Sequence, residues 1–210
     1  MVRIKICGVT DEAAARAAAE AGADAIGLIF AASRRQIEVP AARRISDALP
    51  PFISRVGVVV NKPFERLRSL IKDARLDAVQ LHGDESLEFC AAVRDLGVRV
   101  IKAVPVAGPL DVEHLRALPV GAVLLDTHRA EQRGGTGEVF DWTLAAPVAA
   151  VMPVILSGGL TPANVAAGII AVRPYGVDVS SGVETDGRKD PEKIRAFIGA
   201  ARKADGVVRA

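Results

Sequence analysis

The chain has 210 residues, of which 50% are apolar and 25% are charged, and this composition excludes disordered, collagen-like and disulfide-scaffold proteins. Lysines and arginines total 27 against 25 aspartates and glutamates; the charges are interspersed, so we expect no nucleic-acid partner and no membrane partner. Two cysteines are too few for a secreted disulfide framework, and no apolar stretch approaches the roughly 18 residues of a membrane span. We therefore expect a cytoplasmic protein that acts on a small molecule, and the sequence leaves its oligomeric state open.

Short apolar runs rich in β-branched residues recur along the chain, separated by segments with helical spacing. The predicted strands are residues 2–6, 24–30, 55–60, 77–81, 98–104, 121–125, 153–156 and 176–179. Helix signals lie between them: Thr10 as an N-cap, Gly22 near the end of the same helix, Pro63 at the start of another, and Thr161 with Pro162 at the start of a later one. Strands and helices thus alternate as βα units.

Most of the eight runs are apolar throughout, which is typical of strands covered on both faces in a parallel sheet. Eight βα units in a chain of this length predict an α/β fold, a single-domain (β/α)8 TIM barrel over residues 1–210. The alternative is an open doubly wound sheet. It is disfavoured because no GxGxxG motif opens the first unit.

Polar or glycine-rich residues follow seven of the eight predicted strands, at the end where a barrel carries its chemistry. They are Cys7, residues 33–35, Asn61, His82, Asp126, residues 158–159 and residues 180–182. The opposite strand ends carry ordinary turn and packing residues. Surface loops are often polar, but the one-sided distribution favours a site built from many strands.

Two glycine-containing segments follow the seventh and eighth strands. Gly158 and Gly159 precede a predicted helix, and one unit later Ser180, Ser181 and Gly182 offer two hydroxyls and a backbone amide. Backbone N–H groups at such turns bind anions, and the loops after strands seven and eight commonly bind phosphate in barrels. Either segment alone has the alternative of a simple turn, but together they predict a phosphate ligand.

Cys7 and Asp126 are the candidates for proton transfer. Strand alternation places Lys5 on the same side of the pleat as Cys7, where Asp178 of the neighbouring strand can meet it. The ammonium would favour a thiolate, and an ion pair with Asp178 would reduce that help. A small buried hydrophobe is the alternative for Cys7, as we expect for Cys90 on a helix face. A solvated strand cap is the alternative for Asp126, although the GGTG segment that follows favours catalysis.

The remaining polar candidates are less specific. His82 has two open readings, a side chain of the pocket and a structural histidine, and the histidines show no ligand spacing, so no metal site is predicted. One of Arg34 and Arg35 is expected to bind an anionic group of the substrate, and Arg34 fits better as a solvated surface residue. Gln80 and Lys102 are expected to face the barrel interior.

A set of motifs spread over the chain resembles the phosphoribosylanthranilate isomerases, enzymes of tryptophan biosynthesis. The segments are KICGVT, GLIF with SRR, VGVVVN, VQLHGDE, IKAV, LLDT with GGTGEVFDW, ILSGGLTPANV, and GVDVSSGVE with GRKD. They run in the order of that family from residue 5 to about residue 194, and an ordered set is far more specific than any single glycine-rich loop. The resemblance implies a (β/α)8 barrel that rearranges N-(5-phosphoribosyl)anthranilate, a small phosphosugar, to 1-(2-carboxyphenylamino)-1-deoxyribulose 5-phosphate without a cofactor.

The same resemblance implies roles for particular residues. Cys7 in KICG corresponds to the general base, Asp126 in LLD to the general acid, and Arg35 in SRR to the arginine that holds the anthranilate group. The SGGL and SSG segments correspond to the phosphate grip. The chain departs from the family pattern at Arg34, where proline is frequent, and in the third strand, where VVVN replaces a segment that often contains an aromatic residue.

Two other functions remain as alternatives. The related sugar isomerase of histidine biosynthesis performs the same rearrangement on a substrate with two phosphates, but it uses an aspartate where Cys7 stands. It also needs a second phosphate site in the first half of the chain, where no matching glycine-rich segment occurs. A non-catalytic phosphosugar sensor on the same barrel is the other alternative, and the pair of Cys7 and Asp126 argues against it.

Overall fold

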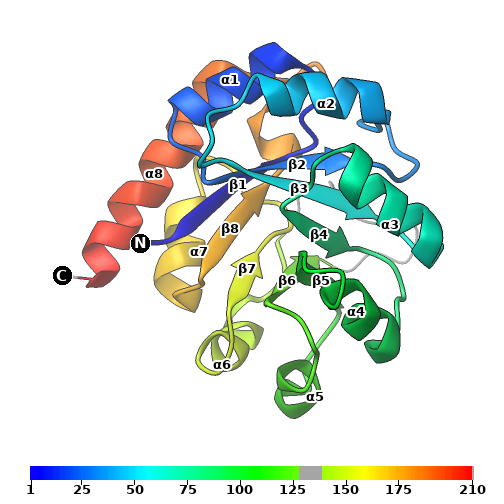
Figure 1. Cartoon of the computed structure of the whole chain (residues 1–210). Coiled ribbons are helices and arrows are strands. Elements are labelled where there is room, and N and C mark those ends of the chain that lie inside the picture. Colours follow the sequence, from blue (N-terminus) through cyan, green and yellow to red (C-terminus); the bar gives the residue numbers. More distant parts are fainter. Residues whose placement is uncertain (128–138, 210) are drawn as a thin grey trace.

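A computed structural model describes residues 1–127 and 139–209, and its eight parallel strands form a closed barrel (Figure 1). The strands are Arg3–Cys7 (β1), Ala25–Ile29 (β2), Ser54–Val59 (β3), Ala78–Leu81 (β4), Arg99–Val106 (β5), Ala122–Thr127 (β6), Val154–Leu156 (β7) and Gly176–Val179 (β8). Closure occurs between β1 and β8, where Lys5 pairs with Asp178. The predicted TIM barrel is confirmed, and the open doubly wound sheet is wrong.

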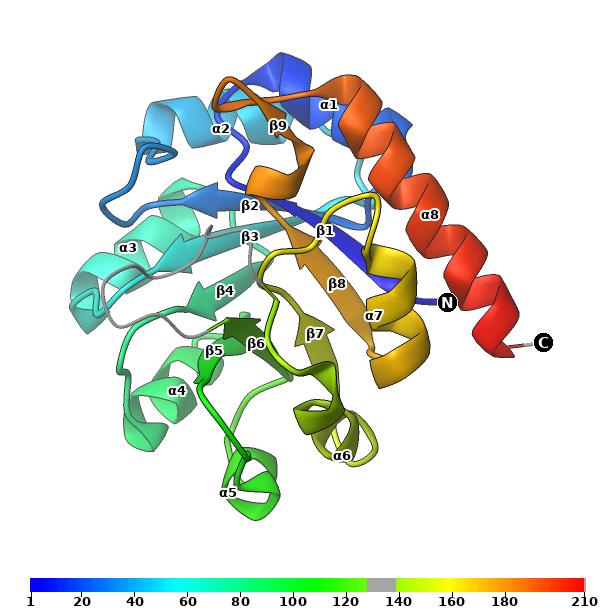
Figure 2. The ribbon, with the colours of Figure 1, turned by 180° about the vertical axis from the view of Figure 1, so that it is seen from behind.

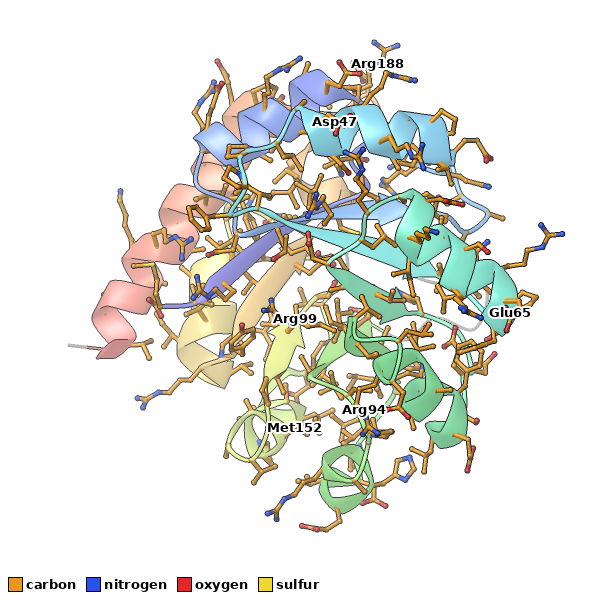
Figure 3. The ribbon with its side chains drawn as sticks, in the orientation of Figure 1. Asp47, Glu65, Arg94, Arg99, Met152 and Arg188 are labelled. Carbon is orange, nitrogen blue, oxygen red and sulfur yellow. The ribbon has the colours of Figure 1, made fainter. Side chains whose placement is uncertain are left out.

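Helices follow the strands and cover the outside of the barrel, as the two opposite views show (Figures 1 and 2). They are Glu12–Glu20 (α1), Val39–Asp47 (α2), Phe64–Asp73 (α3), Leu87–Arg94 (α4), Val112–Arg116 (α5), Ala146–Ala149 (α6), Val165–Val172 (α7) and Pro191–Arg209 (α8). Charged side chains such as Glu65 and Arg188 lie at the periphery (Figure 3). None of the helices that the structure describes combines the length and apolar character that crossing a bilayer requires.

Two helix starts differ from the sequence prediction. Asp11, rather than Thr10, is the N-cap of α1, because its carboxylate accepts a hydrogen bond from the Ala14 N–H. The helix predicted to open at Thr161 begins at Val165. The Asn164 side chain accepts a hydrogen bond from the Thr161 N–H, and this holds residues 161–164 as a turn before α7.

The pleat of the strands sorts side chains into two layers. Inside the barrel lies a small apolar cluster. Its members are Ala103, Ala122, Leu124 and Ile155. Polar side chains that also face the interior line a cavity at the carboxyl ends of the strands. The main core lies between the sheet and the helices and includes Leu81, Leu125 and Phe197. Gln80 faces inward as expected, but Lys102 pairs with Leu81 and belongs to the outer layer.

Lys102 faces outward because a buried partner lies there. Its ammonium lies 3.2 Å from Glu85 Oε2 and donates a hydrogen bond to the Gly83 carbonyl at 2.7 Å. Glu85 also accepts a hydrogen bond from the Asn61 N–H. This ion pair therefore ties the loops after β3 and β4 to β5, and the prediction that Lys102 faces the barrel interior is wrong.

Candidate active site

A cavity of about 840 Å³ opens at the carboxyl ends of the barrel strands. It brings together nearly all the residues that the sequence singled out: Cys7, Arg34, Arg35, His82, Asp126, Gly158, Gly159, Ser180 and Ser181. Gly182 does not line the cavity. A Cβ at that position would collide with the Leu160 carbonyl, so Gly182 is needed where the two glycine-containing loops pack together.

Cys7 is the last residue of β1, and it lies with Lys5 on the inner face of the barrel. The Lys5 ammonium lies 2.8 Å from Asp178 Oδ1, so the predicted buried ion pair is present. Only 6% of Cys7 is exposed. Burial raises the pKa of the Cys7 thiol, Asp178 adds to the rise, and the ammonium groups of Lys5 and Lys189 oppose it. Formation of a thiolate at Cys7 therefore depends on the cations around it.

The Cys7 thiol also lies against strand β2, where the residue paired with Cys7 is a glycine. Gly27 of β2 pairs with Cys7, and a Cβ on Gly27 would lie 2.7 Å from the Cys7 sulfur. The sulfur thus occupies space that any other residue at position 27 would fill. Cys90, in contrast, is fully buried on α4, as predicted from its helix spacing.

Asp126 lies in β6 and belongs to a row of polar side chains across the barrel. His82 Nε2 is 3.6 Å from Asp126 Oδ2, and the Gln80 amide donates a hydrogen bond to His82 Nδ1 at 2.8 Å. The tautomer that matches this contact carries its proton on Nε2, and in that tautomer the Nε2–H faces Asp126. Gln80 lines the cavity, and its Oε1 is buried without a hydrogen-bond partner in the described part of the chain.

The two predicted phosphate loops lie side by side at the ends of β7 and β8. Gly158 and Gly159 have φ angles of 81° and 65°, a left-handed conformation that suits glycine. Their backbone N–H groups donate to no other described residue. Ser180 and Ser181 line the same part of the cavity, and the Ser180 hydroxyl donates to the Cys7 carbonyl at 3.1 Å. The two glycine N–H groups, which have no acceptor among the described residues, suit an anion.

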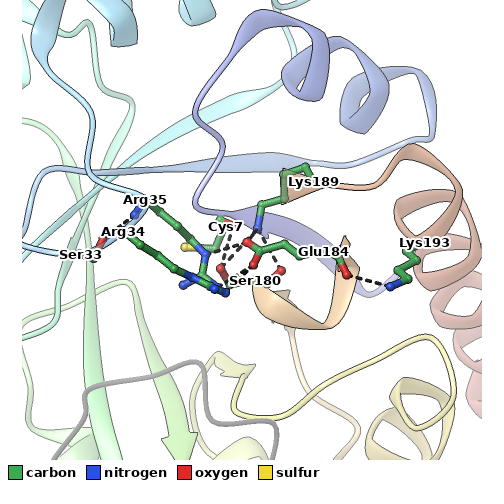
Figure 4. A network of polar contacts seen from close by, with 8 residues as sticks. All are labelled: Cys7, Ser33, Arg34, Arg35, Ser180, Glu184, Lys189 and Lys193. Atoms are coloured by element: carbon green, nitrogen blue, oxygen red, sulfur yellow. Dashed lines mark hydrogen bonds and ion pairs between the residues drawn. The ribbon is translucent and has the colours of Figure 1, made fainter. Parts of the chain in front are cut away.

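Arg35 belongs to a cluster of charged side chains beside Cys7 (Figure 4). Its Nε and Nη2 donate to the two carboxylate oxygens of Glu184, at 2.6 and 2.8 Å. Arg34 and Lys189 contact the same carboxylate, each through one nitrogen, at 2.8 and 2.7 Å. Both arginines line the cavity, but only 12% of the Arg35 side chain is exposed against 60% for Arg34, so Arg35 is the better-fixed group.

Sequence reasoning missed Glu184 and Lys189, which lie on a short hairpin after the last barrel strand. The hairpin pairs Glu184–Thr185 (β9) with Arg188–Lys189 (β10) and follows a single 3₁₀ turn at Ser181–Val183 (η2) (Figure 2). Its two turn residues, Asp186 and Gly187, have φ angles of 50° and 78°. An Asp-Gly pair between strands is a strong hairpin signal, so the sequence contained the clue.

One sequence hypothesis lies outside the described residues. The GGTG segment that was expected to fold over a ligand occupies positions 134–137, between the described ranges. Within those ranges, no group of three or more His, Cys, Asp or Glu side chains could hold a metal ion.

Comparison with known proteins shows which family and which relatives this chain is similar to. Residues 4–200 match the family described as N-(5′-phosphoribosyl)anthranilate isomerase. The enzyme of that name from Desulforudis audaxviator is 50% identical over 206 residues, covering 97% of this chain and all of the relative. A relative of the same name from Moorella thermoacetica is 49% identical and covers 98% of this chain and 92% of its own length.

Solved structures give the same result. The crystal structure of phosphoribosyl anthranilate isomerase from Thermotoga maritima superposes with a TM-score of 0.89 at 44% identity, covering 97% of this chain and 100% of that one. A further crystal structure of such an isomerase, in complex with reduced 1-(o-carboxyphenylamino)-1-deoxyribulose 5-phosphate, has a TM-score of 0.86 at 43% identity. Its coverage is likewise 97% of this chain and 100% of that one.

Proposed function

The chain belongs to the N-(5′-phosphoribosyl)anthranilate isomerase family, an enzyme family of tryptophan biosynthesis, and from that premise we propose how its own residues carry out the reaction. The substrate is N-(5-phosphoribosyl)anthranilate and the product 1-(2-carboxyphenylamino)-1-deoxyribulose 5-phosphate. Cys7 acts as general base and Asp126 as general acid. The solved complex with the reduced product compound supports a phosphosugar ligand for this barrel.

Two anionic ends hold the substrate across the cavity. The phosphate binds the backbone N–H groups of Gly158 and Gly159 and the hydroxyls of Ser180 and Ser181, and for this the Ser180 O–H turns from the Cys7 carbonyl to the phosphate. The ring carboxylate binds Arg35, whose planar guanidinium suits a carboxylate. Anchoring both ends keeps the open-chain sugar in place while its middle rearranges.

The first step is the opening of the ribose ring. Asp126, as the protonated carboxyl, gives its proton to the ring oxygen; the bond from that oxygen to C1 breaks, and a Schiff base with the anthranilate nitrogen forms. The carboxylate left on Asp126 then faces the Nε2–H of His82 at 3.6 Å. His82 is therefore placed to stabilise the charge that develops on the acid.

The second step is proton removal from C2 of the sugar. Cys7, as the thiolate, takes this proton, and the electron pair of the C–H bond forms the enolamine, which tautomerises to the ketone. Tautomerisation adds a proton at C1 and removes one from the C2 hydroxyl, so the Cys7 thiol returns to a thiolate and the Asp126 carboxylate regains its proton with no net gain or loss. Burial raises the pKa of the Cys7 thiol, and the Lys5 and Lys189 ammonium groups, which favour the thiolate, offset part of that rise.

One observation carries the proposal. Cys7 on β1 and Asp126 on β6 line the same cavity, and the two strands between them, β7 and β8, end in the loops that suit a phosphate. The acid and the base can therefore reach a phosphate-anchored sugar from different sides. This is the requirement for an acid at the ring oxygen and a base at C2.

The test is a steady-state assay of the purified chain. N-(5-phosphoribosyl)anthranilate is fluorescent, so its conversion is followed as a loss of fluorescence. Turnover that is abolished in both Cys7→Ala and Asp126→Ala supports the proposal. Tight binding of the substrate without turnover by the unchanged chain would contradict it and favour a phosphosugar sensor.

A further inference from the structure

The buried carboxylate of Glu184 has no part in the proton transfers, although it touches the residue proposed to bind the ring carboxylate. Only 5% of its side chain is exposed, and it has three cationic neighbours, Arg34, Arg35 and Lys189. The arginine and lysine hydrogen bonds lower the pKa of Glu184 in spite of its burial. The carboxylate is therefore a fixed negative charge inside a positively charged cluster.

Glu184 is itself held on several sides. The backbone ladder pairs it with Lys189, whose side chain is 2% exposed and whose ammonium also donates to the Ser180 carbonyl at 2.9 Å. Lys193 at the start of α8 donates to the Glu184 carbonyl at 2.8 Å. In Figure 4 the Glu184 carboxylate lies between the arginines and Lys189. A group held in this way can set the direction of a more flexible partner.

Arg35 is that partner. Its stem passes so close to Gly8 that a Cβ there would collide with the Arg35 Cδ. Its head is gripped along one edge, because Nε and Nη2 both point at Glu184. A guanidinium has five N–H donors in one plane. Nη1 donates to no described residue, and with the second hydrogen of Nη2 it forms another edge that can meet a carboxylate.

We propose that Glu184 is a positioning residue that selects for a carboxylate on the aromatic ring of the substrate. Glu184 occupies one edge of the Arg35 guanidinium and thereby fixes the plane of that group. The other edge of the guanidinium then faces the cavity. Arg35 lines this cavity and Glu184 does not. Glu184 does not touch the substrate. This inference rests on the proposed function, since it takes Arg35 as the group that binds the ring carboxylate.

The experiment compares two ligands that differ only in that carboxylate. The first is reduced 1-(o-carboxyphenylamino)-1-deoxyribulose 5-phosphate, and the second is the same compound made with aniline. Binding of each to the full chain is measured by calorimetry for wild type, Glu184→Gln, Arg35→Lys and the double variant. Gln retains the length of the side chain but offers one acceptor oxygen and no charge, so it cannot form the charge-assisted pair in which each carboxylate oxygen accepts from one arginine nitrogen.

We expect Glu184→Gln to weaken the carboxylate ligand about 10- to 100-fold, the range for a charge-assisted hydrogen-bonded pair, and to leave the aniline ligand within about twofold. In the double variant, the loss should be no larger than in Arg35→Lys alone, because both changes remove the same contact. The unchanged affinity for the aniline ligand also shows that the variant is folded and its phosphate grip is intact.

The matched control is Asp190→Asn, a carboxylate beside the same hairpin that accepts from the Thr185 hydroxyl at 2.7 Å and does not contact Arg35. It should preserve both affinities. An equal loss for both ligands in Glu184→Gln, no loss for either, or tighter binding of the carboxylate ligand would each overturn the positioning role. If wild type itself fails to prefer the carboxylate ligand, the assignment of Arg35 under the proposed function is wrong, which is a separate outcome.

Discussion

The proposed acid role of Asp126 can be tested by replacing one oxygen of its carboxyl group with nitrogen. Asp126→Asn keeps the size of the side chain and the contact with the Thr127 N–H, which Asp126 Oδ1 accepts at 2.9 Å, but it removes the transferable proton. We expect kcat to fall by ~10²–10⁴-fold, the usual loss for a general acid. The fluorescence assay measures this. Asp186→Asn, on the exposed hairpin turn, is the control, and a near-normal rate in Asp126→Asn would remove this residue from the mechanism.

Cys7 makes a prediction about reactivity and pH. Because burial raises the pKa of its thiol above the ordinary value of 9.0, the thiolate fraction, and with it the rate of alkylation by iodoacetamide, should rise about tenfold per pH unit between roughly pH 7 and 9. Inactivation should follow the labelling of Cys7 and be slowed by the reduced product compound.

The control for alkylation is internal to the chain, since Cys90 is fully buried and lines no part of the cavity. Mass mapping should find Cys7 modified before Cys90. A labelling rate that stays constant from pH 7 to 9 would contradict the raised pKa of the thiol, whereas active protein with only Cys90 labelled would contradict the general-base role.

For single residues, the sequence predicted which side chains gather at the site better than it predicted their hydrogen-bond partners. Cys7, Arg35, His82 and Asp126 could be placed because strand ends in a barrel meet at one rim. The pairing of Arg35 with Glu184 joins positions 149 residues apart, and no local pattern carries that information. The hydrogen bond from Gln80 to His82 was equally out of reach, because it depends on side-chain rotation rather than on spacing.

Among the elements, strand β2 makes a specific contribution through Gly27. Gly27→Ala is compatible with strand geometry, but the added Cβ would meet the Cys7 sulfur at 2.7 Å and push it from its position. We expect kcat to fall roughly tenfold or more, since a displacement of about 1 Å at a reacting group costs that much or more, while far-UV circular dichroism stays unchanged.

A matched alanine substitution separates this effect from a general cost of filling space. At Gly121, before β6, an added Cβ would meet the Val100 carbonyl at 3.5 Å, an ordinary contact. Gly121→Ala should therefore keep nearly full activity. Equal losses in the two variants would show that the contact between Gly27 and the thiol has no special role.

The strands were also the elements that the sequence predicted best. The eighth strand has the predicted bounds, and the others differ by one or two residues at either end, because runs buried on both faces have sharp polar limits. The helix after β7 begins later than predicted, because the Asn164 side chain accepts from the Thr161 N–H and holds residues 161–164 as a turn before it. The hairpin of β9 and β10 was missed because each of its strands has only two residues, too few for an alternating pattern.

For the molecule as a whole, one pair of residues, Lys5 and Asp178, indicates how the first and last strands align where the barrel closes. Strand alternation in a closed barrel indicates that Asp178 can meet Lys5, and that pair lies at the seam between the first and last barrel strands. A second set of ion pairs, which also joins the two ends of the chain and is called the second tie below, could not be predicted from the sequence. It joins Asp24 at the start of β2 to Arg3 of β1 and Arg202 of α8, at the opposite rim from the site.

This second tie makes the stability of the whole barrel depend on pH. Asp24 accepts hydrogen bonds from Arg3 at 2.7 Å, from the Ile4 N–H at 2.9 Å and from Arg202 at 2.8 Å, and these contacts, against the effect of burial, lower its pKa in the folded chain below the ordinary value of 3.8. A carboxylate with a lowered folded pKa stabilises the fold above its unfolded pKa and loses that effect as pH falls through the folded one. Asp24→Asn should therefore lower the Tm at pH 7, and the difference from wild type should shrink toward pH 3.

Thermal unfolding followed by circular dichroism at both pH values measures this difference. Glu20→Gln, an exposed carboxylate at the end of α1, is the control and should leave the Tm unchanged at either pH. Activity at room temperature should survive in Asp24→Asn, because the tie lies at the amino-terminal rim while Cys7 and Asp126 stand at the other. A Tm difference that is the same at pH 3 as at pH 7 would mean that Asp24 acts through its shape rather than its charge, and the electrostatic tie between β1, β2 and α8 would then have to be abandoned.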